Sequence, residues 1–218
     1  GSCTFNVDQS GGGTYDPAPQ VNASFTVAPK NLTVTGLTAQ NKVYDRTTTA
    51  TLTGTASLVG VAPADVLNVS VSGGVATFSD RNAANTKTVT VTGMTLSGKA
   101  AGNYTLTQPT LTANITPRPI TVTALQATKV YNGNNNAPLL PLNRASVTSG
   151  NIIAPDFKLV WNATFDNKNV GTNKVMSVTP DTVNDGNGGA NYAITYVANT
   201  TSSITPRTLM VTPVGVNK

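Results

Sequence analysis

The chain has 218 residues with no histidine, no glutamate and one cysteine, so the residue types that enzymes use most for acid–base catalysis and metal binding are scarce. We therefore expect no enzyme and no cofactor. Charged residues make up only 11% of the chain, against roughly 25% in an average soluble domain. The net charge is +5, but the basic residues are scattered singly, which argues against a nucleic-acid-binding surface.

The polar residues are dominated by threonine and asparagine, with 37 and 24 copies. Threonine favours the half-buried surface of a strand, whereas asparagine and glycine favour turns. Good helix formers are few, so we predict an all-β protein. The sequence contains no apolar run of about 18 residues, and we expect no membrane insertion. Cys3 has no partner for an internal disulfide.

Residues 1–30 precede the first complete repeat. The stretch Phe25–Lys30 matches a motif that closes each repeat further along the chain. We therefore predict that residues 1–30 are the end of a preceding unit or form extra strands.

The segments 31–119 and 120–207 share five blocks in unbroken order, at offsets of 87 to 89 residues. Such repetition is typical of tandem architectures, so we predict two repeats of about 88 residues. Leu209–Thr212 matches Ile120–Thr123, which identifies residues 208–218 as the start of a following repeat. The matched blocks are Thr33–Thr35 with Thr121–Thr123, Lys42–Asp45 with Lys129–Asn132, Phe78–Ala83 with Phe165–Val170, Gly102–Tyr104 with Ala190–Tyr192, and Ile115–Arg118 with Ile204–Arg207.

Within a repeat the apolar residues alternate with threonine, as in Thr88–Thr92, where Val89 and Val91 share one face. Short strands between glycine-rich turns predict tandem β-sandwich repeats, Ig-like or β-grasp-like. Pro117 leaves a short, restricted joint between the repeats, which predicts an elongated rod. The matched aromatic residues are expected to anchor the cores: Tyr44, Phe78 and Tyr104, and Tyr131, Phe165 and Tyr192.

Two stretches of the second repeat are candidates for ligand chemistry. The Asp/Asn/Gly-rich stretch 181–187 resembles a calcium loop, with Asp181 and Asp185 as candidate ligands, although the spacing and distal glutamate of an EF-hand are missing. The alternative is a turn rich in Asp and Asn. Trp161, Phe157 and Tyr196 belong to the second repeat alone, and they predict either a stacking surface for a sugar or protein, or a larger core.

The repeat blocks resemble the YDG and MBG repeats of large secreted bacterial adhesins, the filamentous-haemagglutinin-like exoproteins. Arg46 stands where the YDG pattern has glycine, and the second repeat has Tyr131-Asn132-Gly133 and an MBG-like ending at Asn191–Tyr196. The stretches that match the YDG pattern in the first repeat are Lys42–Thr48, Phe78–Asn82, Val89–Gly98 and Gly102–Leu106. The motif residues are Lys42, Tyr44, Asp45, Phe78, Asn103 and Tyr104, and Lys129, Tyr131, Asn132, Phe165, Asn191 and Tyr192.

This resemblance implies a secreted or cell-surface protein whose repeats form a structural or adhesive stalk, with neighbouring repeats of the same chain as partners. It does not imply a particular ligand, because fold does not fix function. The alternatives are a carbohydrate- or protein-binding module with its site on the second repeat, where surface glycans or proteins would bind, and a threonine-rich ice-binding surface.

Overall fold

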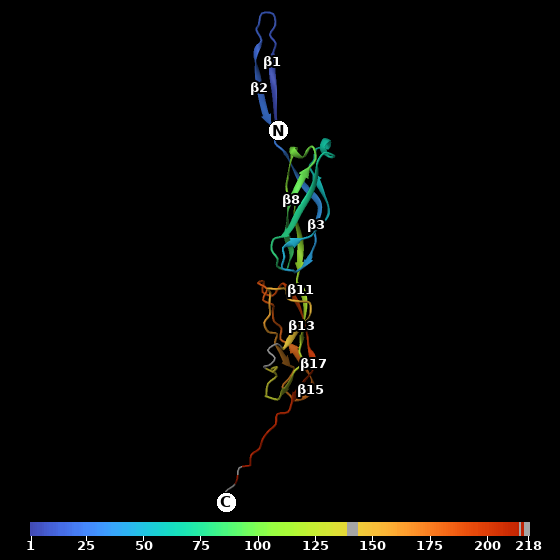
Figure 1. Ribbon diagram of the computed structural model, residues 1–218, viewed down its shortest axis with the longest axis vertical. Coiled ribbons are helices and arrows are strands. Elements are labelled where there is room, and N and C mark those ends of the chain that lie inside the picture. The colour runs from blue at the N-terminus through green and yellow to red at the C-terminus, as the bar shows by residue number, and fades with distance from the viewer. Residues whose placement is uncertain (139–143, 214, 216–218) are drawn as a thin grey trace. The chain divides into compact units, whose positions relative to one another are not determined.

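The computed structural model describes residues 1–138, 144–213 and 215, and it confirms the prediction of an all-β protein (Figure 1). Among these residues, no helix is long and apolar enough to cross a membrane. The chain divides into two compact units, and unit 2 takes in two short segments of the first repeat. Unit 1 comprises residues 1–40, 48–79 and 86–113, and unit 2 comprises residues 41–47, 80–85 and 114–218.

Unit 1 contains two sheets and a separate hairpin. One sheet has the order β6-β3-β9, in which β3 is antiparallel to β6 and parallel to β9. The other has the order β10-β8-β7-β5, in which the first two residues of β8 and the last three of β10 belong to unit 2. The elements are β1 (Ser2–Gln9), β2 (Ala18–Thr26), β3 (Lys30–Ala39), β5 (Thr49–Ala50), β6 (Leu52–Val59), η1 (Pro63–Asp65), β7 (Ser70–Phe78), β8 (Ala84–Ser97), η2 (Ala101–Asn103), β9 (Tyr104–Leu106) and β10 (Thr110–Thr116).

Unit 2 repeats this arrangement. Its sheets have the orders β13-β11-β16, with β11 antiparallel to β13 and parallel to β16, and β12-β17-β15-β14. The short strand β4 (Lys42–Val43) also lies in unit 2, where it pairs with the end of β10 as β12 pairs with β17. The remaining strands are β11 (Arg118–Ala124), β12 (Thr128–Val130), β13 (Ala145–Ser149), β14 (Ala163–Phe165), β15 (Gly171–Val178), β16 (Tyr192–Val197) and β17 (Asn199–Thr205).

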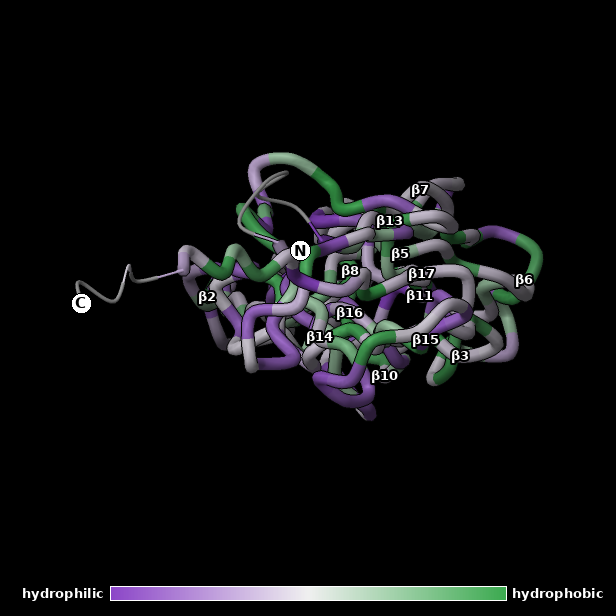
Figure 2. The backbone as a smooth tube through the Cα atoms, turned by 90° about the horizontal axis from the view of Figure 1, so that it is seen from below, coloured by the Kyte–Doolittle hydropathy of each residue, from purple (hydrophilic) through white to green (hydrophobic). Residues whose placement is uncertain are grey.

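Apolar and polar residues alternate along the strands, and the apolar side chains on the inner face form the cores. In Figure 2, which colours each residue by hydropathy, the colour of the tube changes repeatedly along the chain. In β8, Val89 and Val91 are fully buried, while the alternating residues Thr88, Thr90 and Thr92 are exposed. Five of the six expected aromatic anchors are buried, but Tyr131 is only half-buried. The Ig-like or β-grasp-like type of the sandwich remains a prediction.

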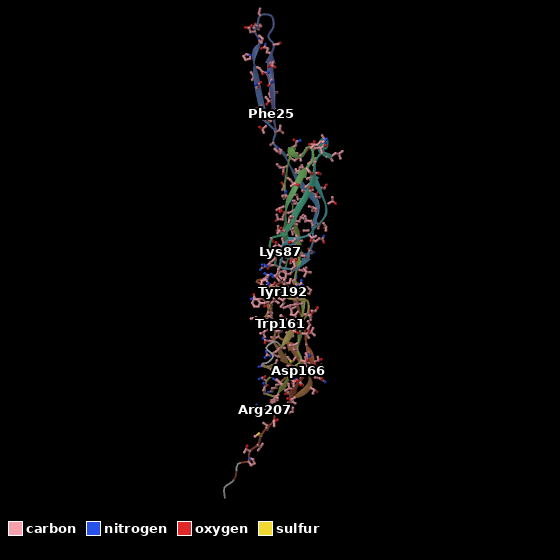
Figure 3. The ribbon with its side chains drawn as sticks, viewed as in Figure 1. Phe25, Lys87, Trp161, Asp166, Tyr192 and Arg207 are labelled. Atoms are coloured by element: carbon pink, nitrogen blue, oxygen red, sulfur yellow. The ribbon has the colours of Figure 1, made fainter. Side chains whose placement is uncertain are left out.

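The hairpin of β1 and β2 has one apolar face. Its register places Cys3 opposite Phe25, Phe5 opposite Ala23 and Val7 opposite Val21. Side chains alternate between the faces of a strand, so these six residues share a face. All six are exposed, including Phe25, which Figure 3 labels.

Candidate functional site

The Lys-Val-Tyr motif forms a loop that is closed by its own lysine. In unit 2, the Lys42 ammonium donates to the Asp45 carboxylate and to the carbonyl and hydroxyl oxygens of Thr47, each at 2.8 Å. Lys129 does the same in the second repeat, with the carbonyls of Asn134 and Asn136 at 2.6 and 2.8 Å. Burial lowers the pKa of Lys129. Each lysine therefore fixes the loop that carries the following tyrosine.

A second pair of matched interactions joins the tyrosine of the Asn-Tyr motif to an aspartate. Tyr104 donates its hydroxyl hydrogen to Asp65 at 2.8 Å, and Ala62 donates its N–H to the same hydroxyl at 3.1 Å. In unit 2, Tyr192 donates to Asp156 at 2.9 Å, and Ile153 donates to Tyr192 at 3.0 Å. The two repeats thus build the same tyrosine–aspartate bond.

In unit 2 the aspartate has two further partners, both from the segment 41–47. Tyr44 donates its hydroxyl hydrogen to Asp156 at 2.9 Å, and the Arg46 guanidinium pairs with the other carboxylate oxygen. The Tyr44 ring meets the Tyr192 ring edge to face, with centroids 5.6 Å apart. Asp156 is buried, and a buried carboxylate is tolerated only when such donors satisfy it.

Asn191 receives the segment 80–85 beside this aspartate. Its side-chain oxygen accepts the Ala83 N–H at 2.7 Å, and its amide donates to Asn82 at 3.3 Å. Asn191 is completely buried. We call Asp156, Asn191 and Tyr192 the receiving set of unit 2, and Tyr44, Asn82 and Ala83 the inserting set that contacts it.

The departure from the YDG pattern at Arg46 has a visible consequence. Arg46 has a φ of +66°, and Gly133 at the matching place has +84°. This left-handed region favours glycine. Arg46 adopts it in a loop closed by Lys42, and its side chain then pairs with Asp156.

Burial raises the pKa of Tyr192 to about 12, and the hydrogen bond to Asp156 contributes to the rise. The pKa of Tyr44 is raised by the same two causes. Both phenols therefore stay protonated at neutral pH and act as hydrogen-bond donors. The hydrogen bonds that Tyr44 and Tyr192 donate to Asp156 therefore hold separate segments of the chain together. Among the described residues, no group of three or more acidic or cysteine side chains could hold a metal ion.

Unit 2 also contains an open pocket of about 570 Å³, where the second repeat departs from the first. Ser70 pairs with Ser97 at the far end of the β7–β8 ladder. The matching residues of the second repeat, Phe157 and Asn184, form one isolated bridge. Pro180 takes the place of Gly93 and has no N–H for the ladder. The strands separate there, and the pocket is lined by Phe157–Val160, Asn162, Asp181–Gly186 and Gly188.

The predicted ligand residues lie in or near this pocket. Phe157 is half exposed on its wall. Trp161, labelled in Figure 3, is buried and meets Tyr196 edge to face at 6.3 Å. The Lys158 ammonium lies 5.6 Å from the Trp161 ring centre and pairs with Asp181. Of the three aromatic residues, Phe157 therefore offers the most accessible surface, with Leu159 (79% exposed) beside it.

Asp181 and Asp185 line the same pocket, but different partners hold them. The Asp181 carboxylate pairs with Lys158 and accepts the Thr182 N–H at 2.7 Å. The buried Asp185 accepts three backbone N–H groups, which close the loop before β16: those of Asn187, Gly189 and Asn191, at 2.7, 2.9 and 2.9 Å. Asp185 therefore acts as the centre of a turn rich in Asp and Asn.

The sequence analysis assigned no role to Asp65, Asp156 or Asn82, and it noted Arg46 only as a departure from the YDG pattern. A signal was present for the aspartates, because each is in a short apolar stretch before the middle strands of its repeat: Ala62-Pro63-Ala64-Asp65 and Ile153-Ala154-Pro155-Asp156. Their offset of 91 residues lies outside the 87 to 89 residues that separate the other blocks, so the repeat spacing alone does not identify this pair.

The model of the YDG domain matches residues 28–112 and 116–202 of the chain. These ranges cover most of its length, so the chain belongs to the YDG domain family as two tandem repeats. YDG repeats are non-catalytic structural modules that are typical of bacterial surface proteins. Comparisons with curated proteins and with solved structures find no match. The MBG-like character of the second repeat remains a prediction.

Replacing Tyr44 by Phe should destabilise unit 2 by about 1–2 kcal/mol, because Asp156 stays buried with one donor fewer. Urea unfolding followed by the fluorescence of Trp161, the single tryptophan, reports on unit 2. Tyr131→Phe is the matched control and should change the unfolding free energy by less than about 0.5 kcal/mol, since Tyr131 is half-buried. Equal effects of the two variants would contradict the role given to Asp156.

Asp185→Asn should remove a pH-dependent part of the stability. Burial by itself raises the pKa of Asp185, but the three N–H donors hold it below its ordinary value. A carboxyl group with a lowered pKa stabilises the fold above its unfolded-state pKa of about 4, and this contribution disappears as the pH falls through the folded-state pKa. The variant should lose about 1–3 kcal/mol at pH 7 and much less in acid. A difference that stays constant between pH 7 and pH 2 would contradict this assignment.

Proposed function

We propose that the chain is a load-bearing, structural segment of a secreted or cell-surface bacterial adhesin, which projects a binding head or holds cells together. The observation that carries the proposal is the position of the strands through which the chain enters and leaves each repeat. In the first repeat, β3 lies between β6 and β9, and β10 lies between β4 and β8. In the second, β11 lies between β13 and β16, and β17 between β12 and β15.

Tension along the chain acts first on these strands. Because each is paired on both edges, it can leave its sheet only when two ladders of backbone hydrogen bonds break. Forced unfolding depends on the rate of unfolding, and that rate falls when many bonds must break together. Strands at the edge of a sheet, such as β13 and β14, do not carry the chain into or out of the repeat.

The apolar face of the β1–β2 hairpin supports an array of further repeats. Val21, Ala23 and Phe25 match Leu111, Ala113 and Ile115 of β10, which face the core of the first repeat. The proposal therefore takes residues 1–30 as the last strands of a preceding unit, whose core would cover the hairpin. A semi-rigid rod, joined at Pro117, belongs to the same proposal and is testable by small-angle scattering.

Single-molecule pulling on the complete chain tests the load-bearing role. Two unfolding events are expected, each releasing a contour length of roughly 300 Å, because about 85 residues at up to 3.6 Å each become extended. The two repeats should unfold at similar forces, since they share their strand order. Extension without distinct unfolding events would refute the proposed function.

A second candidate function is the binding of a glycan or an extended peptide in the pocket of unit 2. It is favoured by the combination of exposed Phe157 and Leu159 with the Lys158–Asp181 ion pair, since sugar and peptide sites combine apolar surface with a few fixed polar groups. The first repeat has an unbroken β7–β8 ladder at this place.

Screening a glycan array and a peptide library with the complete chain tests this candidate. Binding should weaken about tenfold or more in Leu159→Ser, which removes an apolar side chain at the pocket. Leu67→Ser is the control, because Leu67 is an exposed leucine of unit 1. Binding that both variants reduce equally, or no binding at all, would contradict a site in this pocket.

A further inference from the structure

The receiving set of unit 2 has a counterpart in unit 1 that lacks the inserting residues. Asp65, Asn103 and Tyr104 match Asp156, Asn191 and Tyr192. The tyrosine–aspartate distance is 2.8 Å in one unit and 2.9 Å in the other, so the two sets are built alike.

The exposure of the two sets differs. Asp156 and Asn191 are buried, whereas Asp65 is half-buried and Asn103 is exposed. In unit 2 the additional contacts come from Tyr44 and from the segment 80–85. Among the described residues, the only side chain that donates to Asp65 is that of Tyr104. The receiving set of unit 1 is therefore complete in itself but uncovered.

The inserting set is also present twice. Tyr131, Asn169 and Val170 of unit 2 match Tyr44, Asn82 and Ala83. The backbone supports both tyrosines in the same way: Tyr44 donates its N–H to the Thr116 carbonyl at 2.9 Å, and Tyr131 donates to the Thr205 carbonyl at 2.8 Å.

In contrast to Tyr44, which is fully buried, Tyr131 is half-buried, and Asn169 and Val170 are exposed. The described residues contain no hydrogen-bond partner for the Tyr131 hydroxyl. The loop that carries Tyr131 is nevertheless fixed by Lys129. The two loops adjoin the same strand, because Lys129 and Gly171 both pair with Ile204 of β17. A fixed phenol donor together with an exposed amide and an exposed valine has the composition of a docking surface.

We propose that Tyr131, Asn169 and Val170 form the docking surface for the receiving set of another YDG repeat, which follows in the same polypeptide. This proposal deepens the proposed structural function and rests on it. The partner must present a carboxylate to the Tyr131 hydroxyl and an asparagine to the backbone at Val170, as Asp156 and Asn191 do for Tyr44 and Ala83.

Residues 208–212 support the choice of this partner. Leu209 and Val211 match Ile120 and Val122, which are buried in the central strand β11. Leu209 and Val211 are 82% and 88% exposed. They have the pattern of an opening strand, and the core of a following repeat would bury them. That repeat would start directly after β17, next to the loop of Tyr131, because β12 pairs with β17.

The test extends the complete chain by one repeat. A copy of residues 124–207 is placed after Thr212, which matches Thr123, and the copy of Tyr131 is changed to Phe so that the original tyrosine alone reports. Hydroxyl-radical labelling with mass spectrometry measures the reactivity of Tyr131 in the original and extended chains. Tyr15, 78% exposed in unit 1, is the internal control.

Labelling of Tyr131 should fall about tenfold in the extended chain, which corresponds to about 1.4 kcal/mol of docking free energy. Asp156→Asn in the appended copy should restore most of the labelling. Val170→Asp in the original repeat should also restore the labelling of Tyr131. Because Val170 is exposed, this variant tests the docking surface without any change in the appended copy.

Equal labelling of Tyr131 in the two chains would overturn the proposal, and so would protection that neither variant reduces. An appended copy that does not fold beside the original repeat also counts against it. The pulling experiment concerns the strands inside each repeat, so unprotected Tyr131 together with two clear unfolding events would reject the docking surface and leave the structural function standing.

Discussion

The hydrogen bond from Tyr192 to Asp156 is the interaction on which unit 2 depends. It holds a carboxylate in a buried place, and a buried charge without partners destabilises a protein by several kcal/mol. Tyr44 and Arg46 complete the set of donors, and Asn191 binds the neighbouring segment 80–85. The compact unit therefore includes two loops that belong to the first repeat in sequence. A chain with few charges and a single cysteine joins its segments by such buried polar contacts.

The sequence predicted the parts of this structure that have a local cause. Alternation in Thr88–Thr92 placed Val89 and Val91 inside, and the five matched blocks identified two repeats of one family. Asp156 could not be found in this way, because Tyr44 lies 112 residues earlier in the chain and alternation says nothing about such a contact. Tyr131 has the same motif as Tyr44 but is half-buried, since burial depends on what contacts the loop and not on the loop alone.

The pocket of unit 2 is a second feature that local sequence patterns do not predict. Phe157 and Asp181 could be chosen as candidates from their types, but the pocket itself exists because a ladder is interrupted between the pairs Ala163–Val178 and Phe157–Asn184. Pro180 is the local cause that the sequence displays. Whether a proline opens a sheet or merely ends a strand depends on how the neighbouring strand is paired with it. That pairing cannot be read from the segment around the proline alone.

The location of this interruption makes the two proposed functions, load bearing and binding, compatible within one repeat. The lost pairs lie between β14 and β15, and β14 is at the edge of its sheet, whereas β17 and β11 occupy central positions. Opening the edge leaves both ladders of β17 and both ladders of β11 in place. The receiving set is likewise undisturbed, because Asp185 ties the loop before Tyr192 by three backbone hydrogen bonds. The second repeat can therefore vary at its edge strand while the central strands β11 and β17, which we propose to bear load, and the contacts around Asp156 stay as they are.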